Sequence, residues 1–355
     1  MKRRTFLQSA AAATIFAAPA IHAASKSDSN LVVGQGDHRF EVQHEWPKLP
    51  KEYNWQTTHN VAVDAAQNVY VIHEGKPNLW GHPSIFVFDP DGKFLRAFGW
   101  EFQGGGHGIE IRKEGSDEFI YVCAYQGVKA FSKMTLKGER VWIKHAPMES
   151  KAYAENENSS RTAVWGRNRF LPTNFAFLPD GGFLLADGYG AWRIHRYDKD
   201  ANWVSTFGGP GKGEGTFDTP HGICIDDRQG RTPMICVCDR ANHTLQYFTM
   251  DGKYVETVKG FGLPANAETW KDLLVVPELK ARVSLLDSKN NVVATLGEDV
   301  KRIEAPNGDT IRNDAKRWQA GKFVHPHDAC FNAAGDIFVA EWVATGRVTK
   351  LKRLS

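Results

Sequence analysis

The stretch PTNFAFLPDGGFLLADGYGAWRIHRYDKDANWVSTFG, residues 172 to 208, contains four short runs of alternating apolar residues joined by turns. Its DG and KD turns are typical of antiparallel strand pairs, so the segment predicts a unit of four β-strands. Related segments begin near residues 59, 107, 220, 264 and 326, a spacing in the range of roughly 40 to 65 residues expected of four-stranded units with variable loops. Six copies predict an all-β fold, a six-bladed β-propeller.

The repeats cover residues 31 to 355, which we interpret as one propeller domain. The last copy has too few strands for a complete blade. We therefore expect the segment LVVGQGDHRFEVQHEW, residues 31 to 46, to supply the missing strand and close the ring, which hides the sheet edges. Two polar stretches, residues 148 to 170 and 297 to 321, interrupt the repeat and are predicted to be loops on the propeller faces.

The composition is that of a globular protein without a nucleic-acid partner. Hydrophobic residues make up 42% of the chain and charged residues 24%, which is enough apolar material for cores between blades. The net charge of +3 comes from Lys2, Arg3 and Arg4, because without these three bases the chain has as many basic as acidic residues. The sequence has no basic patch that would indicate nucleic-acid binding.

Residues 1 to 23, MKRRTFLQSAAAATIFAAPAIHA, have the pattern of a removable export signal. They combine a basic start, an apolar run too short to span a bilayer, and small residues before the expected cut. Arg3 and Arg4, followed by Phe6 and Leu7, resemble a twin-arginine signal, which directs folded cargo to the twin-arginine export machinery. We expect a periplasmic or extracellular protein without stable membrane insertion.

Five cysteines lie inside predicted strands, where they are expected to be small buried hydrophobic residues. They are Cys123, Cys224, Cys236, Cys238 and Cys330. A single disulfide from Cys224 to the neighbouring strand remains an alternative. The chain has no CxxC pair, which argues against a thiolate metal site.

One slot of the repeat holds a polar residue in all six copies: His59, His107, Asn174, His221, Asn266 and His327. His107, His221 and His327 fall on every second blade, roughly 120° apart around a six-fold ring, and would meet at the axis. A single histidine in a strand is more often a core or surface residue. Three neutral imidazoles that leave one position open are, however, the ligand set of a catalytic zinc site. We expect His59 to line the opposite wall of the axis.

Three further runs carry a resemblance to a known family. They are LLADGYGAWRIHRYD (184 to 198), ICVCDRANHTLQYF (235 to 248) and FVHPHDACFNAAGDIFVAEW (323 to 342). Together they resemble the peptidyl-hydroxyglycine alpha-amidating lyase family, a six-bladed propeller with NHL-type repeats. The similarity extends from about residue 31 to residue 355.

This resemblance implies a set of site residues. Zinc would be held by His107 and His221, both in HGI, and by His327 in PHD. Tyr189, in DGY, would act as a base or acid, and Arg240, in CDR, would line the site.

The resemblance also implies a structural calcium ion in the axial channel. Its ligands would be Asp328 and the backbone carbonyls of Val63 and Ile109.

Two positions depart from the family pattern around the substrate. Glu74 replaces the arginine of the family's HRG motif, which changes a positive charge to a negative one, and His325 replaces a methionine before PHD. Gly190 stands where the family has a cysteine, so the disulfide of that cysteine is lost. These substitutions change the expected substrate shell and keep the histidines.

Tyr189 and Arg240 can also be interpreted without the family. Each follows the end of an equivalent strand in consecutive blades, so both should emerge on one face of the ring. A phenol beside zinc and a guanidinium can have a lowered pKa, and an arginine can bind a carboxylate. The alternatives are an aromatic wall for Tyr189 and, for Arg240, an ion pair with Asp239 or Asp187.

The leading functional hypothesis is a zinc-dependent exported lyase that cleaves the N–C bond of a carbinolamide and releases an amide and glyoxylate. Its partner would be a small-molecule or peptide substrate. A second hypothesis keeps the metal and predicts hydrolysis of a lactone or ester, with Glu74 as a candidate base. A third is a non-catalytic NHL propeller that binds a peptide, glycan or protein.

Overall fold

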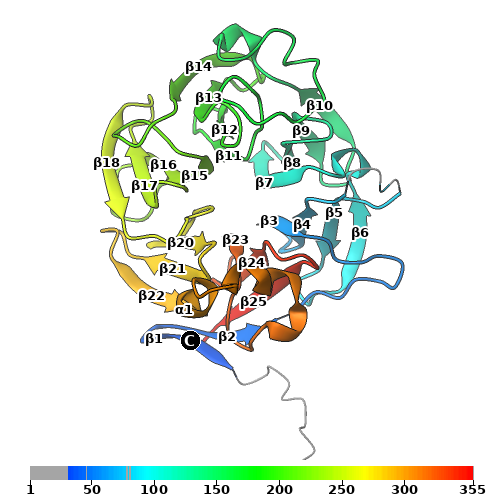
Figure 1. The fold of residues 1–355 in the computed structure, drawn as a ribbon, viewed down its shortest axis with the longest axis vertical. Coiled ribbons are helices and arrows are strands. Elements are labelled where there is room, and N and C mark those ends of the chain that lie inside the picture. The colour runs from blue at the N-terminus through cyan, green and yellow to red at the C-terminus, as the bar shows by residue number, and fades with distance from the viewer. Residues whose placement is uncertain (1–30, 45, 77–78, 80, 355) are drawn as a thin grey trace, which may run out of the picture.

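The computed structural model describes residues 31 to 354 apart from 45, 77, 78 and 80, and the expected export signal lies outside these residues. The described chain forms six antiparallel sheets arranged as a ring around a central axis (Figure 1). The prediction of a six-bladed β-propeller is confirmed. In the part of the chain that the structure describes, no helix is long and apolar enough to cross a membrane.

Each blade is one sheet, and we number the blades by the chain order of their innermost strands. Blade 1 contains β3 (Thr58–Val63), β4 (Val69–His73), β5 (Ile85–Phe88) and β6 (Phe94–Phe98). Blade 2 contains β7 (Gly106–Glu114), β8 (Asp117–Ala124), β9 (Ala130–Thr135) and β10 (Arg140–Lys144). Blade 3 contains β11 (Asn174–Phe177), β12 (Phe183–Asp187), β13 (Arg193–Tyr197) and β14 (Trp203–Gly208).

Blades 4 to 6 continue the ring. Blade 4 contains β15 (Pro220–Asp226), β16 (Met234–Asp239), β17 (Thr244–Phe248) and β18 (Tyr254–Lys259). Blade 5 contains β19 (Glu268–Trp270), β20 (Leu273–Glu278), β21 (Arg282–Leu286) and β22 (Val292–Leu296). Blade 6 contains β23 (Pro326–Phe331), β24 (Ile337–Glu341), β25 (Arg347–Arg353), β2 (His38–Gln43) and β1 (Val32–Gln35).

The first strands of the described chain complete the last blade. β2 pairs antiparallel with β25, with Val42 opposite Leu351, and β1 pairs with β2 as a fifth strand. The predicted closure of the ring is therefore confirmed. The additional strand β1 was not predicted.

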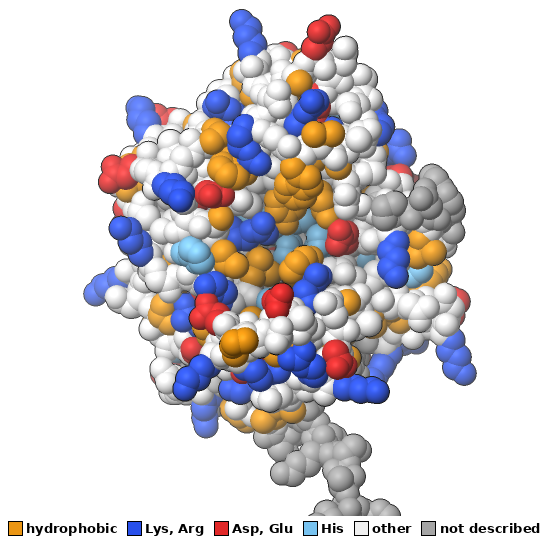
Figure 2. All heavy atoms as spheres, in the orientation of Figure 1, with side chains coloured by type: hydrophobic (Ala, Val, Ile, Leu, Met, Phe, Trp, Pro, Cys, Tyr) orange, Lys and Arg blue, Asp and Glu red, His pale blue; other side chains and the backbone are white. Residues whose placement is uncertain are grey.

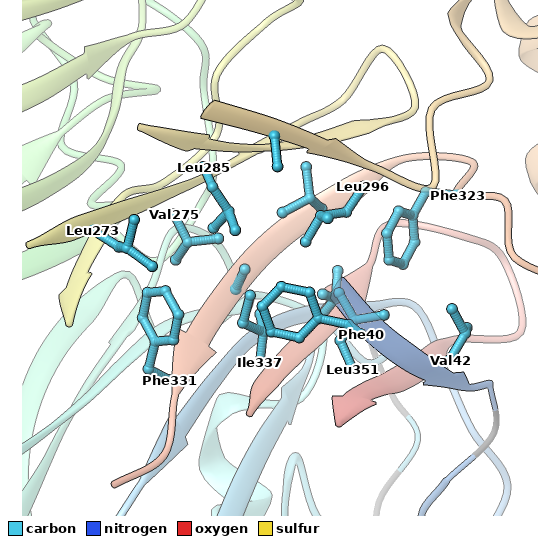
Figure 3. Packing of buried hydrophobic residues seen from close by; sticks show 14 residues of the cluster. Phe40, Val42, Leu273, Val275, Leu285, Leu296, Phe323, Phe331, Ile337 and Leu351 are labelled. Carbon is cyan, nitrogen blue, oxygen red and sulfur yellow. The ribbon is translucent and has the colours of Figure 1, made fainter. Parts of the chain in front are cut away.

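Apolar cores fill the spaces between neighbouring blades, and strand alternation explains how each blade serves two of them. In β8, Ile120 and Val122 pack in the core between blades 1 and 2, while Tyr121 and Cys123 pack in the core between blades 2 and 3. Successive side chains of a strand point to opposite faces of its sheet, so each face meets a different neighbour. Figure 3 shows the core between blades 5 and 6, in which Phe40 of β2 takes part.

A buried acid ends the second strand of several blades and ties down the segment that leads to the inner strand. Asp187 accepts a hydrogen bond from the backbone N–H of Leu171 at 2.7 Å, and Asp239 accepts one from Asp218 at 2.8 Å. In blade 6, Glu341 accepts one from Val324 at 2.8 Å. The bonded backbone groups all precede the polar slot of the repeat by three residues. This recurring contact holds the entrance to each of these inner strands in place.

The two polar insertions lie where loops were predicted, but both contain ordered turns. Residues 297 to 321 include helix α1 (Val300–Ile303) and two 3-10 turns, Gly308–Asn313 and Ala315–Arg317. Residues 148 to 170 include the 3-10 turn Met148–Ser150. A further 3-10 turn, Trp100–Phe102, precedes β7.

Removing a buried side chain from β2, the strand that closes the ring, should destabilise the protein. Phe40 is 1% exposed in the core between blades 5 and 6, so Phe40→Ala should lower the free energy of unfolding by about 3–5 kcal/mol. Val32→Ala, on the neighbouring β1 but 47% exposed, should change it by no more than about 0.5 kcal/mol. Urea unfolding followed by circular dichroism compares the two, and equal effects would contradict a closing role for β2.

Candidate metal centre

A β-bulge places each of four histidines at the axis. In β3, Thr58 pairs with His73 and Asn60 pairs with Ile72, so His59 is an extra residue without a partner in β4. The same irregularity occurs at His107, His221 and His327 in β7, β15 and β23. A bulge leaves one residue outside the ladder and redirects its side chain. The side chains of these four residues therefore point out of the blades and into the channel.

Backbone carbonyls orient three of these rings. The Nδ1 atom of His107 lies 2.7 Å from the oxygen of Thr173, and that of His221 lies 2.6 Å from the oxygen of Ala265. His327 makes the same contact, 2.7 Å, with the carbonyl of His59. Because a carbonyl only accepts, each Nδ1 carries the proton and each Nε2 has a free lone pair.

The free nitrogens meet at the axis. The Nε2 atoms of His107 and His221 lie 3.1 Å apart. The ring of His327 is centred 5.0 Å from that of His107 and 4.7 Å from that of His221. The structure thus brings together the three histidines singled out from the sequence.

All three imidazoles are held neutral. Burial lowers the pKa of His107, His221 and His327 well below the ordinary value of histidine, and neighbouring histidines and Arg240 lower it further. A neutral ring is the form that binds a metal ion, so burial keeps these side chains ready for ligation at neutral pH.

The expectation for His59 was wrong, because His59 belongs to the same cluster. Its ring is centred 4.7 Å from that of His107 and 4.6 Å from that of His327. Nitrogens of these three residues lie within 4.8 Å of one another, an arrangement that could hold a metal ion. The alternation of histidine and asparagine around the ring did not predict this, because His59 occupies a blade outside the three-fold set.

The cluster fits a metal ion on chemical grounds. Two Nε2 lone pairs that face each other at 3.1 Å repel unless a positive charge lies between them. Nitrogens bound tetrahedrally to zinc at about 2.0–2.1 Å would lie about 3.3 Å apart, close to this separation. The carbonyl contacts at Nδ1 are the outer-shell contacts that usually orient metal-bound histidines.

Tyr189 and Arg240 reach the same point from the ends of β12 and β16. The hydroxyl of Tyr189 lies 2.9 Å from Nε2 of His221 and 3.1 Å from Nε2 of His107. A guanidinium nitrogen of Arg240 donates to this hydroxyl at 3.2 Å, and its carbon lies 5.1 Å from the centre of the Tyr189 ring.

The structure contradicts the ion-pair interpretation of Arg240 and gives a direction for the pKa of Tyr189 in the protein without metal. Among the described residues, Arg240 forms no ion pair with Asp239 or Asp187. Backbone and side-chain donors near each of these two acids already bind its carboxylate. Burial raises the pKa of Tyr189, against the opposing effect of Arg240. The sequence-based expectation of a lowered pKa concerned a phenol beside bound zinc and stays a prediction, whereas in the protein alone the phenol keeps its proton.

Glu74 lies beside His59 on the wall of the pocket. Its carboxylate is 3.5 Å from Nε2 of His59 and accepts a hydrogen bond of 2.5 Å from the hydroxyl of Tyr125. Burial alone would raise the pKa of Glu74, but His59 and Tyr125 outweigh it and hold the pKa below the ordinary value. Glu74 is therefore an anion in contact with the histidine cluster.

A cavity of about 380 Å³ opens above the cluster, and Figure 2 shows the hollow with histidine, charged and hydrophobic side chains around it. Its lining includes His59, Glu74, Tyr125, Trp165, Tyr189, Arg240, Leu263, Leu279, His327 and Trp342. This volume suits a small ligand. His325, a sequence-based candidate for the substrate shell, is not among the residues that line the cavity and lies behind Trp342, with ring centres 5.9 Å apart.

The first insertion contributes a residue to this pocket, and the second contacts one of the residues that line it. Trp165, in the first insertion, is 58% exposed, and its ring is centred 5.0 Å from that of Tyr189. Arg312, in the second, stacks on Trp342 with its guanidinium carbon 3.3 Å from the ring centre. The polarity of these loops did not reveal which of their residues would face the axis.

Carboxylates line the channel near the histidines, and sequence analysis found only one of them. Asp328 accepts hydrogen bonds from the N–H of Val61 at 2.8 Å and the amide of Asn266 at 2.6 Å. Burial raises its pKa to about 7 and that of Glu268 to about 8, and burial with both neighbours raises that of Glu110 well above normal. A hard cation would relieve this repulsion, so these residues fit calcium.

The ligation of that calcium by the carbonyls of Val63 and Ile109 stays a prediction. Ile109 is buried in the core between blades 1 and 2, and its N–H donates to Asn60 at 3.2 Å. Glu110 lies on the same inner strand as His107, three residues further on, which is the signal that could have identified it.

All five cysteines lie in strands and are free thiols. Cys224 and Cys236 pair directly across β15 and β16 but form no disulfide. The strand placement was predicted correctly, and the alternative of a disulfide at Cys224 is not found. Gly190 is buried where a side chain would meet the carbonyl of Arg169, so this chain has no room for a larger residue there.

Comparisons with known proteins find sequence similarity to NHL repeat-containing proteins. No protein-family model matches it. It is 28% identical over 214 residues to NHL repeat-containing protein 3 of Homo sapiens and 24% identical over 223 residues to that of Mus musculus. The matches cover 58% and 61% of this chain but only 55% and 58% of the relatives, so the chain spans little more than half their length.

Solved structures confirm the fold. A streptogramin B lyase structure superposes with a TM-score of 0.54 at 11% identity, covering 88% of this chain and 97% of that one. A putative gluconolactonase gives 0.55 at 12% identity, covering 91% and 99%. A virginiamycin B lyase from Staphylococcus aureus, bound to quinupristin, gives 0.51 at 13% identity, covering 89% and 100%. At such low sequence identities, the superpositions show a shared propeller fold, and the fold alone does not determine the activity.

A buried ion pair anchors the insertion that carries Trp165. Glu157 is 2% exposed, contacts the ammonium group of Lys129 at 2.5 Å and the guanidinium of Arg169 at 3.0 Å, and accepts the N–H of Phe170. Burial raises the pKa of Glu157, but these partners outweigh it and the net shift is downward. The pair fixes the base of the loop against blade 2.

Glu157→Gln should therefore destabilise the protein by about 3–5 kcal/mol, because it leaves Lys129 buried without its counter-charge. The folded-state pKa is below the unfolded value of about 4.3, so the stabilisation is present above that pH and lost as the pH falls through the folded pKa. Urea unfolding of both proteins between pH 7 and pH 3 should show a shrinking difference. Asp200→Asn, at an exposed pair with Lys199, is the control and should have no effect at any pH.

Proposed function

We propose that the axial pocket is the active site of a metal-dependent lyase that cleaves the N–C bond of a carbinolamide and releases an amide and glyoxylate. One observation carries the proposal. The hydroxyl of Tyr189 lies within 3.1 Å of two free imidazole nitrogens and within 3.2 Å of Arg240, at the floor of a cavity. A proton donor, an anion-binding group and a set of metal ligands thus meet at one point.

His107, His221 and His327 would hold the metal, which we propose is zinc. Bound there, the ion would supply Lewis acidity to a substrate oxygen. The carbonyls at each Nδ1 fix the rings so that their lone pairs face the axis.

Arg240 and Tyr189 would act on the substrate directly. The guanidinium of Arg240 presents paired N–H groups to the substrate carboxylate and orients the scissile bond. Cleavage breaks the C–N bond, removes the proton of the carbinol hydroxyl and adds a proton to the amide nitrogen. Burial raises the pKa of Tyr189, so the phenol is protonated and can donate a proton to that nitrogen; the proton that leaves the carbinol hydroxyl would then restore the phenol.

Aromatic side chains would enclose the acyl part of the substrate. The walls of the cavity include Tyr125, Trp165 and Trp342. These aromatic side chains offer apolar surface to the substrate and carry no charge that would bind the metal in its place. This enclosure also excludes water, which strengthens the electrostatic contacts of Arg240.

Hydrolysis of a lactone or ester is the second candidate. It is favoured by Glu74, whose lowered pKa keeps a carboxylate available in the pocket to deprotonate water. A lyase and a putative gluconolactonase both share the propeller fold with this chain. A non-catalytic propeller that binds a peptide, glycan or protein would need no metal.

We further propose that the protein is exported and carries calcium in the channel. The twin-arginine pattern of residues 1 to 23 supports passage of the folded, metal-loaded protein to the periplasm or the exterior. The carboxylates of Glu110, Glu268 and Asp328 support calcium beside the histidine centre.

Metal content distinguishes the enzymes from the binding module. Plasma mass spectrometry of the purified mature protein should find about one zinc per chain, and a variant with His107, His221 and His327 all changed to Ala should have none. Circular dichroism should show that the variant keeps its β-sheet signal. Metal-free, folded wild-type protein that takes up no added zinc would leave only the binding module.

Removing the proton donor should slow turnover strongly while leaving the metal in place. Tyr189→Phe should lower kcat on a hydroxyglycine peptide by about 10²–10⁴-fold, the range for general acid–base catalysis, with unchanged zinc content. The matched control is Tyr254→Phe, because Tyr254 lies on β18 at the periphery of blade 4 and bonds Thr257. Equal activity of the two variants would exclude Tyr189 as the donor.

A further inference from the structure

His59 differs from the other three histidines in its contacts. It is 2% exposed, yet neither ring nitrogen has a hydrogen-bond partner among the described residues. Its backbone carbonyl accepts from His327, but its own ring has no such acceptor in the next blade. A buried imidazole that leaves both nitrogens unsatisfied costs free energy, so this arrangement points to a missing partner.

That partner must lie at the cluster, because the ring of His59 faces it. The ring stacks on His327 at 4.6 Å with an interplanar angle of 16°, and meets the edge of His107 at 4.7 Å. Nitrogens of His59, His107 and His327 lie within 4.8 Å of one another, and His107 also approaches His221 to 3.1 Å. A single ion near His107 is therefore within reach of all four rings.

Glu74 provides the charge that such a centre needs. Its carboxylate lies 3.5 Å from Nε2 of His59, which is too far for a good hydrogen bond but places a negative charge beside that ring. Four neutral imidazoles leave the charge of a divalent ion uncompensated. An anion behind one of them lowers the cost of holding that charge in a buried site.

We propose that His59 is a fourth protein ligand of the axial metal and that Glu74 is its outer-shell partner. The inference rests on the metal site of the proposed function and goes beyond its three-histidine set. It also gives a reason for an acid at position 74, where the resemblance predicts arginine. A cation there would repel the ion.

The proposal defines the class of metal. Four imidazole ligands suit a divalent first-row transition ion. If the ion also binds a substrate, it must accept five or six ligands in total. Zinc meets this requirement by expanding its coordination, and so do iron, cobalt and nickel ions in the divalent state. The open position would face Tyr189 and the cavity.

Cobalt(II) loading tests the proposal without relying on activity. Apo protein is titrated with cobalt(II), the visible d–d absorption is recorded, and affinity is measured by competition with a chelator. His59→Ala should bind about tenfold or more weakly and should change the energy and intensity of the absorption, because the ligand set changes. Glu74→Gln should weaken binding by about 10–100-fold with a spectrum close to that of the wild type.

His145→Ala is the control for loss of a histidine, because His145 lies far from the axis and bonds the carbonyl of Lys129. It should leave both affinity and spectrum unchanged. Circular dichroism melting of each variant shows that its fold is intact. X-ray absorption at the metal edge of the wild-type protein gives a second reading, and it should count four imidazoles.

The outcomes separate the two proposals. Wild-type protein that binds metal, together with a His59→Ala variant of the same spectrum and affinity, would overturn the role of His59 and keep the three-histidine site. Three imidazoles at the metal edge would have the same meaning. Wild-type protein that binds no metal would overturn the proposed function and this inference together.

Discussion

The pairing of β2 with β25 is the contact on which the axial site depends. It joins the first described strands of the chain to the last blade and brings blade 6 against blade 1. Across that junction the Nδ1 of His327 meets the carbonyl of His59, and Asp328 meets the N–H of Val61. Because these residues are far apart in sequence, their contacts exist only in the closed ring. The geometry of the histidine cluster is thus a consequence of closure.

The bulges and the buried acids convert this scaffold into a site. An extra residue in an inner strand points a side chain at the axis, and the acids at the ends of second strands hold the approach to those strands. Packing on both faces of each blade then prevents the inner strands from shifting. The four rings can therefore remain close together although their lone pairs repel one another.

Charge is distributed in layers along the axis. The neutral histidines separate the pocket from the channel carboxylates, which are Glu110, Glu268 and Asp328. In the pocket, Arg240 and Glu74 line different parts of the wall. This distribution allows a metal ion at the histidines and a second cation among the acids. Glu74 lies on the wall of the pocket and also beside His59, so its charge acts on both the pocket and the histidine cluster. The structurally similar lyase and putative gluconolactonase share the propeller fold, and that fold does not determine this chemistry.

The sequence alone determined the blade count, the closure and the equivalent positions of His107, His221 and His327, because strand alternation and repeat spacing are local properties of the chain. It also identified Tyr189 and Arg240, which follow equivalent strands in consecutive blades. Only the tertiary structure decided that His59 joins the cluster, that Arg240 bonds Tyr189 in place of an acid, that the pKa of Tyr189 is raised, and that His325 lies behind Trp342. Distances across the axis and the burial of each group depend on how six blades pack together, and no local pattern contains that information.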